Sequence, residues 1–354
     1  MAIETSCDDT SIGIVNYENG SFINPLLITR SQIEQHQLYG WVVPEIAYRL
    51  HEEQILSIIK EIWYNQIIDC DSITVTKEPW LPWSLVVGNT VASMLSYFFN
   101  KPLYRVNHID GHIFSLLLDR NIADCPFPRL ILTASGGHNE MYYINLLNNA
   151  SLSQSNMIRK NLQIKKIGYS LDDAAGESFD KVARMLWWTY PWWPWISMMA
   201  KEYIAWKSVL EIAWKDLFKR ILLDGKWSNI SQERVDQQRH NFSFSGMKSQ
   251  VYQLLTKRPL ELLCQDDIAY ICHEFQECIS DILVTKVFAA ACSFQVKTLW
   301  LVWGVSANDR LYEKLKDIVE QSSFDFHVMR PMKKVYSTDN AAMIGLVWLM
   351  QMIS

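Results

Sequence analysis

Two histidines four residues apart could bind one metal ion. His108 and His112 lie in the stretch NHIDGHIFSL, and on a helix the side chains of residues i and i+4 share one face. Neutral imidazole is a common metal ligand. Two ligands alone leave a metal short of donors, and with eight histidines in the chain such a pair also arises by chance. The spacing by itself is therefore a weak metal signature.

A Ser-Gly-Gly turn is a second place where chemistry could occur. Residues 133–137 read Thr-Ala-Ser-Gly-Gly and lie between two β-like runs, where glycines let the backbone approach a ligand closely. Free backbone N–H groups at such a turn can hold a phosphate or a carboxylate. An ordinary hairpin turn explains the Gly-Gly pair equally well, so both interpretations stay open.

Carboxylates gather at two predicted helix starts. Asp172, Asp173, Glu177 and Asp180 lie in SLDDAAGESFDK, where the helix dipole favours acidic residues without any further function. Asp339 precedes an apolar helix, and the ordinary role of an aspartate there is to cap the helix. The stretch NFSFSGMK lacks the spacing of a Walker loop, so its pattern predicts no nucleotide role.

Two β-turn-β units and several helices must position these residues. The first unit surrounds the polar turn Glu4 to Ser11, and the second spans Arg129 to Asn145 around the Ser-Gly-Gly turn. This repetition predicts two lobes built alike, although no sequence repeat proves it. Apolar periodicity predicts helices over 43–67, 85–99, 267–292 and most of 170–265, with strands over 72–75, before His108 and at the start of TLWLVWGVSANDRL.

Composition excludes several classes of protein. With 354 residues, 49% hydrophobic and 20% charged, the chain can bury a large core in two domains or two related lobes. It has no apolar run of about 18 residues and no leader pattern, so we expect no membrane span and a cytoplasmic location, with the mitochondrial matrix as the alternative. Seven cysteines without framework spacing predict reduced thiols.

The charge balance limits how nucleic acid could bind. A net charge of −5 argues against a chain that coats nucleic acid by bulk electrostatics, so any contact needs a local basic patch or a partner protein. A solvated loop is the ordinary interpretation of such short basic runs. The candidate patches are Arg159, Lys160, Lys165 and Lys166, and the pair Lys333 and Lys334.

Eight motifs in one order resemble a known enzyme family. They are IETSCDDTS, SQIEQHQLYGWVVPEIAYRLH, VNHIDGHI, TASGGHNE, LDDAAGESFDKVARML, NFSFSGMK, VSANDRL and STDNAAMIG, and they span residues 1 to about 349. Together they resemble the tRNA threonylcarbamoyladenosine transferase family (TsaD, or Gcp), and most closely its bacterial and mitochondrial branch. The resemblance implies an α/β fold of the actin-like ATPase (ASKHA) type, with two similar lobes of mixed sheets flanked by helices. The lobes are expected at 1–125 and 126–354, with a helical insertion at about 170–265 and a chain end free to pack back on the N-terminal lobe.

The resemblance also implies an acyltransferase. Its reaction moves the threonylcarbamoyl group from threonylcarbamoyl-AMP to N6 of adenosine 37 in tRNAs that read codons beginning with A. Asp8 or Asp9, beside the first turn, could act as acid or base or steer the amine. By the resemblance, one divalent metal per subunit, iron or alternatively zinc, is held by His108, His112 and Asp339, and the adenylate is held by Thr133, Ala134, Ser135, Gly136, Gly137, Asp180 and Asn308, with Trp193 at a glycine position of the pocket.

The partners implied are tRNA and threonylcarbamoyl-AMP. A bacterial chain would act with a paralogous TsaB-type partner and a TsaE-type ATPase, whereas a mitochondrial-like chain would form a homodimer. Two other functions stay open: a scaffold in the same complex that does not bind the adenylate, and a metallopeptidase, which an old label of the family suggests. The peptidase has little support because Ile109, Asp110 and Gly111 separate the histidines, without the glutamate base of H-E-x-x-H.

Tryptophan stands where the family motifs have glycine. The chain has 15 tryptophans and only 13 glycines, although glycine usually makes up about 7% of residues. A residue with a Cβ at a positive-φ glycine position costs about 1–2 kcal/mol. An indole at Trp193 is expected to occlude the adenylate pocket, or else to stack on the adenine. The other replaced positions are Trp41 in YGW, Trp80 and Trp83 in EPWLPWS, Trp187 and Trp192 in LWWTYPWWP, and Trp303 before Gly304.

Overall fold

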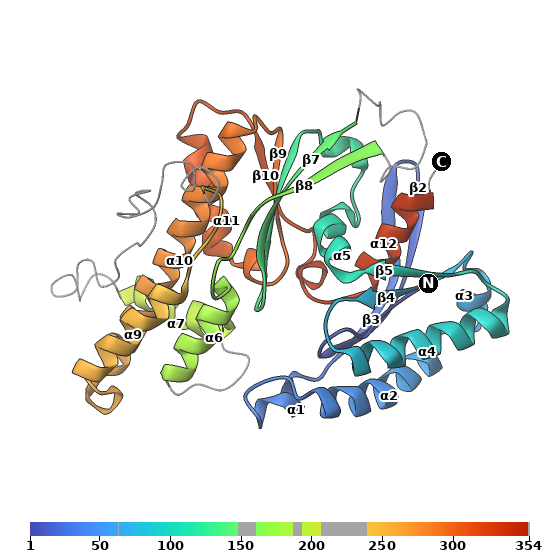
Figure 1. The fold of residues 1–354 in the computed structure, drawn as a ribbon, viewed down its shortest axis with the longest axis horizontal. Coiled ribbons are helices and arrows are strands. Elements are labelled where there is room, and N and C mark those ends of the chain that lie inside the picture. Colours follow the sequence, from blue (N-terminus) through green and yellow to red (C-terminus); the bar gives the residue numbers. More distant parts are fainter. Residues whose placement is uncertain (63, 148–160, 187–192, 207–238, 353–354) are drawn as a thin grey trace. The chain divides into compact units, whose positions relative to one another are not determined.

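The computed structural model describes residues 1–62, 64–147, 161–186, 193–206 and 239–352 (Figure 1). The chain forms two compact units. Unit 1 combines Met1–Phe127, Asn145–Gln163 and Met329–Ser354, and unit 2 combines Pro128–Ile144 and Ile164–Val328. The C-terminal segment therefore belongs to the same unit as the N-terminus. Residues 187–192, which include part of the tryptophan cluster, lie outside the described residues.

A five-stranded mixed sheet forms the centre of unit 1, in the order β3-β2-β1-β4-β5. β1 pairs antiparallel with β2 and parallel with β4, and β4 pairs parallel with β5. The β1–β2 pair confirms the predicted β-turn-β unit at the start of the chain. The strands are β1 (Ala2–Glu4), β2 (Asp9–Glu18), β3 (Ser21–Ser31), β4 (Ile73–Glu78) and β5 (Leu103–Asn107).

Helices cover both faces of this sheet because successive side chains of a strand point to opposite faces. Ile3 belongs to the core that α2 and α4 complete on one face, whereas Ala2 lies against Gly345 of α12 on the other (Figure 1). α12 also packs against α5. The helices of unit 1 are α1 (Ile33–Gln37), α2 (Pro44–Glu61), α3 (Tyr64–Ile68), α4 (Pro82–Phe99), α5 (His108–Phe114) and α12 (Ala341–Met352), with 3-10 turns at η1 (Ser115–Leu117), η2 (Ile122–Asp124) and η6 (Lys334–Ser337).

The helix predicted over 43–67 is shorter than expected. α2 ends at Glu61 because Ile62 adopts an extended conformation, with φ −84° and ψ 127°. The separate helix α3 then begins at Tyr64. The apolar periodicity continues across this break, which is why the sequence pattern alone did not reveal it.

The second sheet repeats the first. Read from one edge, its order is β8-β7-β6-β9-β10, with β6 antiparallel to β7 and parallel to β9. β6 thus corresponds to β1, β7 to β2 and β9 to β4. The shared topology confirms the predicted α/β fold with two similar lobes, the actin-like ASKHA arrangement. The strands are β6 (Arg129–Ala134), β7 (Asn139–Leu146), β8 (Leu162–Tyr169), β9 (Thr298–Val302) and β10 (His327–Met329).

Strand β8 corrects the interpretation of the first basic cluster as a solvated loop. Lys165 and Lys166 lie within this strand, and Lys166 forms an ion pair with Glu140 of β7. Arg159 and Lys160 lie outside the described residues. In the second cluster, Lys333 pairs with Asp119. Part of the positive charge in both clusters is therefore already balanced by carboxylates.

A long helix dominates the core of unit 2. α10 (Gln265–Ser293) confirms the helix predicted over 267–292, and it buries Phe275, Ile279 and Leu283 at four-residue spacing. It packs against α7, α11 and β6. The other elements of this unit are α6 (Ala175–Met185), α7 (Trp193–Trp206), α9 (Ser245–Lys257), α11 (Asp309–Glu320), and the 3-10 turns η4 (Leu260–Leu262) and η5 (Val305–Ala307).

All seven cysteines are free thiols. Within the described ranges, each helix lacks either the length or the apolar character that crossing a membrane requires.

Candidate functional site

His108, His112 and Asp339 come together in unit 1. The His112 Nε2 atom lies 3.1 Å from Nε2 of His108 and 3.0 Å from Oδ1 of Asp339, and His108 Nε2 lies 3.5 Å from the same oxygen. Both imidazoles are fully buried, whereas the carboxylate is partly exposed. Donor atoms spaced in this way suit ligands that each lie about 2.0–2.2 Å from a single ion. These three residues therefore fit a metal ion.

The start of α5 sets the two imidazoles on one face. β5 ends at Asn107, whose side chain accepts a hydrogen bond from the backbone N–H of Ile109 at 2.8 Å and so caps the helix. His108 is the first helical residue, and His112 follows one turn later on the same face. The cap thus fixes where the helix begins and which way both imidazoles point.

Asn340, and not the candidate metal ligand Asp339, caps the helix α12. Asn340 Oδ1 accepts a hydrogen bond from the backbone N–H of Met343, and its amide donates to the carbonyl of Thr338. The capping role that the sequence suggested for Asp339 therefore belongs to Asn340. The carboxylate of Asp339 is left to face the histidines.

The surroundings shift the pKa values of the two buried histidines in opposite directions. Burial lowers the pKa of His112 to about 4. Burial acts in the same direction on His108, but the carboxylates of Asp339 and Glu4 outweigh it and raise the pKa of His108. His112 is therefore neutral at pH 7 and offers a lone pair, the form in which imidazole binds a metal.

The turn between β1 and β2 adjoins the histidines. Glu4 Oε2 lies 3.0 Å from His108 Nδ1, and Ser6 Oγ lies 3.1 Å from the same nitrogen. Sequence reasoning did not single out Glu4. The signal in the sequence was a charged residue directly after the apolar residues of the short strand AIE. In the structure this strand is fully buried, and a buried charge requires hydrogen-bond partners.

Two adjacent aspartates follow in the same turn. Burial raises the pKa of Asp9 to about 8, and the charges of Asp8 and Asp339 add to this rise. The Oδ1 atom of Asp9 is buried and has no hydrogen-bond partner among the described residues. Asp9 therefore holds a proton at pH 7, beside Asp8 and within electrostatic reach of the metal ligand Asp339.

The Ser-Gly-Gly turn of unit 2 is held tightly against the start of α6. Ser135 Oγ accepts hydrogen bonds from the backbone N–H groups of Gly137 and His138, at 3.3 and 3.0 Å. Gly176, in the first turn of α6, donates its N–H to the Ser135 carbonyl at 3.2 Å. A Cβ at position 176 would lie 2.4 Å from that oxygen, so only glycine allows this approach. A turn next to a helix N-terminus favours an anionic ligand.

The other predicted residues of this turn flank it. Thr133 and Ala134 are buried at the end of β6, whereas a Cβ added to Gly136 would meet open space. Asp180 lies on α6, four residues after Gly176 and thus one turn further along the helix. The turn therefore has a buried base and an open side.

Asn308 follows strand β9, and the Ser-Gly-Gly turn follows the neighbouring strand β6. β6 and β9 are parallel, so the residues that follow each strand meet at one edge, which is where ligands bind in many α/β sheets. The Asn308 amide donates to Ser197 Oγ and to Gln276 Oε1, both at 3.1 Å. Trp193 begins α7, one turn before Ser197, and its side chain lies outside the described part of the chain. Asn308 thus connects α7, α10 and α11 beside the turn.

Two tryptophans have the backbone conformation typical of glycine. Trp80 has φ 91° and Trp303 has φ 76°, in the left-handed region that residues with a Cβ rarely occupy. Both stand where the family motifs have glycine. Trp80 packs edge-on against His108, with ring centroids 6.1 Å apart, and the buried Trp303 stacks on His138 at 6.5 Å. Each indole therefore lies beside a candidate site.

An ion pair next to Asn308 carries a prediction for stability. Although burial raises the pKa of Glu277, hydrogen bonds from Arg310 and Lys314 outweigh it and lower this pKa to about 2. Because the folded pKa is depressed, the stabilisation is present above about pH 4.5, the ordinary glutamate pKa, and is lost as the pH falls toward 2. We expect Glu277→Gln to lower the free energy of unfolding by about 1–3 kcal/mol at pH 7 and by much less near pH 2.5.

Denaturant unfolding at both pH values measures this effect. Glu61→Gln, at the half-exposed pair with Arg30, is the matched control and should cost under about 1 kcal/mol. A loss for Glu277→Gln that is the same at both pH values would show that packing, not charge, is responsible.

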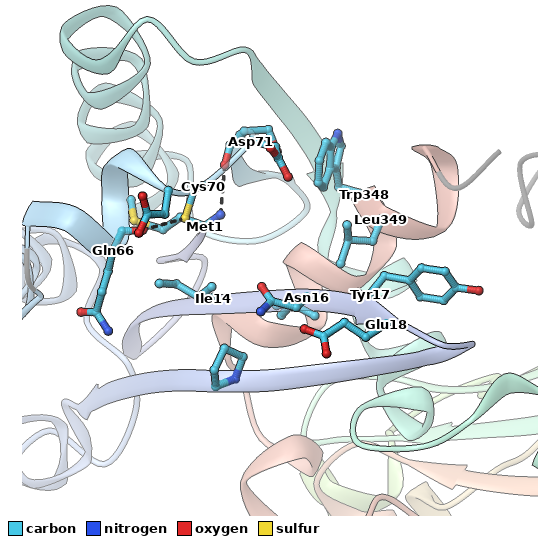
Figure 2. A pocket seen from close by; sticks show the side chains of 14 residues that line it. Met1, Ile14, Asn16, Tyr17, Glu18, Gln66, Cys70, Asp71, Trp348 and Leu349 are labelled. Carbon is cyan, nitrogen blue, oxygen red and sulfur yellow. Dashed lines mark hydrogen bonds between the residues drawn. The ribbon is translucent and has the colours of Figure 1, made fainter.

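A pocket of about 500 Å³ lies in unit 1, and Figure 2 shows its lining side chains. Asn16, Glu18, Asp71 and Trp348 are among its lining residues, and the amino group of Met1 donates to the carbonyl of Ser72 at its wall. None of the described residues that line it is a predicted site residue. The metal ligands and the Ser-Gly-Gly turn therefore stay the candidate functional residues.

Comparisons with known proteins identify the family. Residues 26–346 match the TsaD family, tRNA N6-adenosine threonylcarbamoyltransferase. The tRNA N6-adenosine threonylcarbamoyltransferase of Kosmotoga olearia is 36% identical over 350 residues, which cover 98% of this chain and 91% of that protein. The Bacillus subtilis protein of the same name is 36% identical over 351 residues, covering 98% and 88%. Among solved structures, a ROK family protein from Streptococcus pneumoniae is similar over 98% of this chain and 96% of that protein's chain, with a TM-score of 0.42 and 12% sequence identity. The chain therefore belongs to the TsaD family of tRNA N6-adenosine threonylcarbamoyltransferases.

Proposed function

We propose that this acyltransferase moves the threonylcarbamoyl group from threonylcarbamoyl-AMP to N6 of adenosine 37 in tRNAs that read codons beginning with A. The observation that carries the proposal is the His108, His112 and Asp339 cluster in a chain of this family. The open space beside Gly136, next to the N-terminus of α6, supports it, because a helix N-terminus favours the negative phosphate of an adenylate.

The metal is proposed to be iron, with zinc as the alternative. Two histidines and one carboxylate are the ligand set of non-haem iron(II) sites, which keep positions open, and of some zinc enzymes. When bound, the ion supplies positive charge that polarises a carbonyl or organises a phosphate. His112 suits this role because it is neutral and buried.

The adenylate is proposed to bind in unit 2. Gly136 leaves open space beside the turn, and the N-terminus of α6 favours the negative phosphate. Asp180 is proposed to bind the ribose hydroxyls as an acceptor, and Asn308 to hold the neighbouring elements in place through its bonds to Ser197 and Gln276. Trp193 is proposed to restrict this pocket at its position at the start of α7.

The reaction itself needs orientation and one proton transfer. The N6 nitrogen forms a bond to the carbamoyl carbon, the bond from that carbon to the phosphate oxygen breaks, and AMP leaves while N6 loses one proton. Because Asp9 holds a proton, Asp8 is proposed to be the ionised base that accepts it. The mixed anhydride needs no covalent nucleophile, and burial, the largest cause, raises the pKa of the neighbouring Cys7 thiol well above its usual range.

The test is reconstitution of the reaction. Purified protein, threonylcarbamoyl-AMP and a tRNA with adenosine 37 are expected to yield the threonylcarbamoyl nucleoside, detected by mass spectrometry after digestion. The same tRNA with guanosine at position 37 is the control and should give none. If no product forms with partners present while complexes still assemble, the chain is a scaffold. A metallopeptidase activity has no supporting observation, because Ile109, Asp110 and Gly111 offer no glutamate base between the histidines.

A helical face of unit 1 is proposed to bind a partner. Trp83, Val86, Met94 and Tyr97 lie on one face of α4 and are exposed, with Tyr97 84% exposed. An apolar face of this kind marks a protein interface. The proposed occupant is a paralogous TsaB-type protein, assisted by a TsaE-type ATPase, and the alternative is a second copy of this chain.

Substitution on this face tests whether it binds the TsaB-type partner or a second copy of this chain. Tyr97→Asp is expected to weaken the association at least about 10-fold, because a charge in a buried apolar contact is costly. Light scattering of the chain alone and with the partner gives the measurement. Tyr252→Asp, at an exposed tyrosine of unit 2, is the control. Unchanged association of the Tyr97 variant would place the interface elsewhere.

A further inference from the structure

The carboxylate of Glu4 is built into the first sheet. Glu4 is the last residue of the central strand β1 and is 0% exposed. Its Oε1 accepts the backbone N–H of Ser6 at 2.6 Å, and its Oε2 accepts the Thr76 hydroxyl of the neighbouring strand at 2.5 Å. Both oxygens are thus held by the fold before any ligand binds.

This carboxylate also faces a metal ligand. Oε2 of Glu4 lies 3.0 Å from Nδ1 of His108, a residue 104 positions away in the chain. A buried carboxylate needs donors, so its favourable partner is a proton on Nδ1. With the proton on Nδ1, the lone pair of His108 lies on Nε2, the atom that is 3.1 Å from His112 Nε2 and 3.5 Å from Asp339 Oδ1.

We propose that Glu4 is a positioning residue that holds His108 in the Nδ1–H tautomer and so directs Nε2 toward the metal. Carboxylates that accept the second ring N–H of a metal-bound histidine fix its orientation and strengthen it as a ligand. The inference rests on the metal site of the proposed function. It does not depend on the acyl transfer or on the identity of the metal.

Ser6 is the competing partner for the same nitrogen. Its hydroxyl lies 3.1 Å from His108 Nδ1, close to the distance of Glu4. A hydroxyl can donate as well as accept, so it does not select one tautomer. Both oxygens of the Glu4 carboxylate already accept hydrogen bonds, from the Ser6 backbone N–H and from the Thr76 hydroxyl, so this side chain faces Nδ1 as an acceptor. The carboxylate therefore imposes the tautomer, and the serine does not.

The test compares metal affinities of three proteins. Zinc is titrated against a competing chelator into the wild-type chain, Glu4→Gln and Ser6→Ala. Glu4→Gln keeps the size of the side chain but places an amide N–H group near Nδ1, which favours the wrong tautomer. We expect its zinc affinity to fall about 10–100-fold, and that of Ser6→Ala to change less than about threefold. Equal losses for both variants, or no loss for Glu4→Gln, would overturn the proposal.

Two further readouts keep the inference separate from folding and from the reaction. The visible spectrum of the cobalt-substituted Glu4→Gln variant should differ from that of the wild type, because one ligand is reoriented. In wild-type protein with ¹⁵N-labelled histidine and bound zinc, His108 should carry its proton on Nδ1. A proton on Nε2 would refute the inference even if the variants fail to fold. If the zinc results hold but no nucleoside is modified, the proposed reaction fails and the role of Glu4 stands.

Discussion

Replacing His112 with alanine is expected to abolish metal binding and to lower the rate of threonylcarbamoyl transfer by at least about 100-fold. His112 is the ligand closest to both others, with Nε2 at 3.1 Å from His108 and 3.0 Å from Asp339. Without it, two donors remain, which is too few to hold a divalent ion in a defined geometry. Metal content by elemental analysis and the rate of nucleoside formation give the two measurements.

The control for this variant is another histidine. His327→Ala removes an exposed imidazole of unit 2 and should change neither metal content nor rate. Because His112 is buried, the unfolding midpoint of each metal-free variant must be compared, so that a folding defect is not mistaken for a lost ligand. A His112→Ala protein that keeps its metal and its rate would show that the histidines serve the core only.

Glycine at position 303 is expected to give a more stable protein than alanine at the same position. Trp303 has φ 76°, which glycine adopts freely and which costs a residue with a Cβ about 1–2 kcal/mol. Trp303→Gly and Trp303→Ala both lose the indole contacts, so their difference reports mainly the backbone. Because the unfolded chain gains entropy with glycine, the net advantage is about 1 kcal/mol. Denaturant unfolding of both variants measures it.

Trp348 provides the matched comparison. It lies in the helix α12, where glycine is less stable than alanine by about 1 kcal/mol. The order of the two variants should therefore reverse between the positions, glycine above alanine at 303 and alanine above glycine at 348. If the alanine variant were more stable than the glycine variant at both positions, the left-handed backbone at position 303 would have no measurable cost in free energy. Trp80, with φ 91°, should behave like Trp303.

His112 belongs to the polar residues that the family motifs share, whereas Trp303 departs from those motifs. The polar residues of both candidate sites are present, whereas tryptophan occupies positions at which the motifs have glycine. The structure shows the physical consequence at two of these positions, since the backbone at Trp80 and Trp303 keeps a conformation suited to glycine. The indole of Trp303 then has to be accommodated next to the Ser-Gly-Gly turn, where it stacks on His138. The expected cost at this position is therefore both a strained backbone and a filled space.

Much of the fold follows from local patterns. The β1–β2 pair, α4 and α10 lie where alternation and helical periodicity predicted them, because these signals depend on neighbouring residues only. The break after Glu61 and the strand β8 were missed. The first lies inside a continuous apolar pattern, and the second is a strand rich in lysine whose pairing with β7 decides its conformation.

The sequence alone determined the family, because eight motifs in a fixed order depend on residue identity and not on geometry. It also supplied His108 and His112 as a pair, since one helical turn separates them. The resemblance to the family added Asp339 as the expected third ligand, although the local pattern favoured a helix cap. Only the tertiary structure showed that Asp339 lies 3.0 Å from His112, that Asn340 caps α12, and that Glu4 lies behind His108. The physical reason is distance along the chain: 227 positions separate His112 from Asp339, and 104 separate Glu4 from His108, so no local pattern can relate them. The packing of β1, α5 and α12 brings these residues within hydrogen-bond distance of one another.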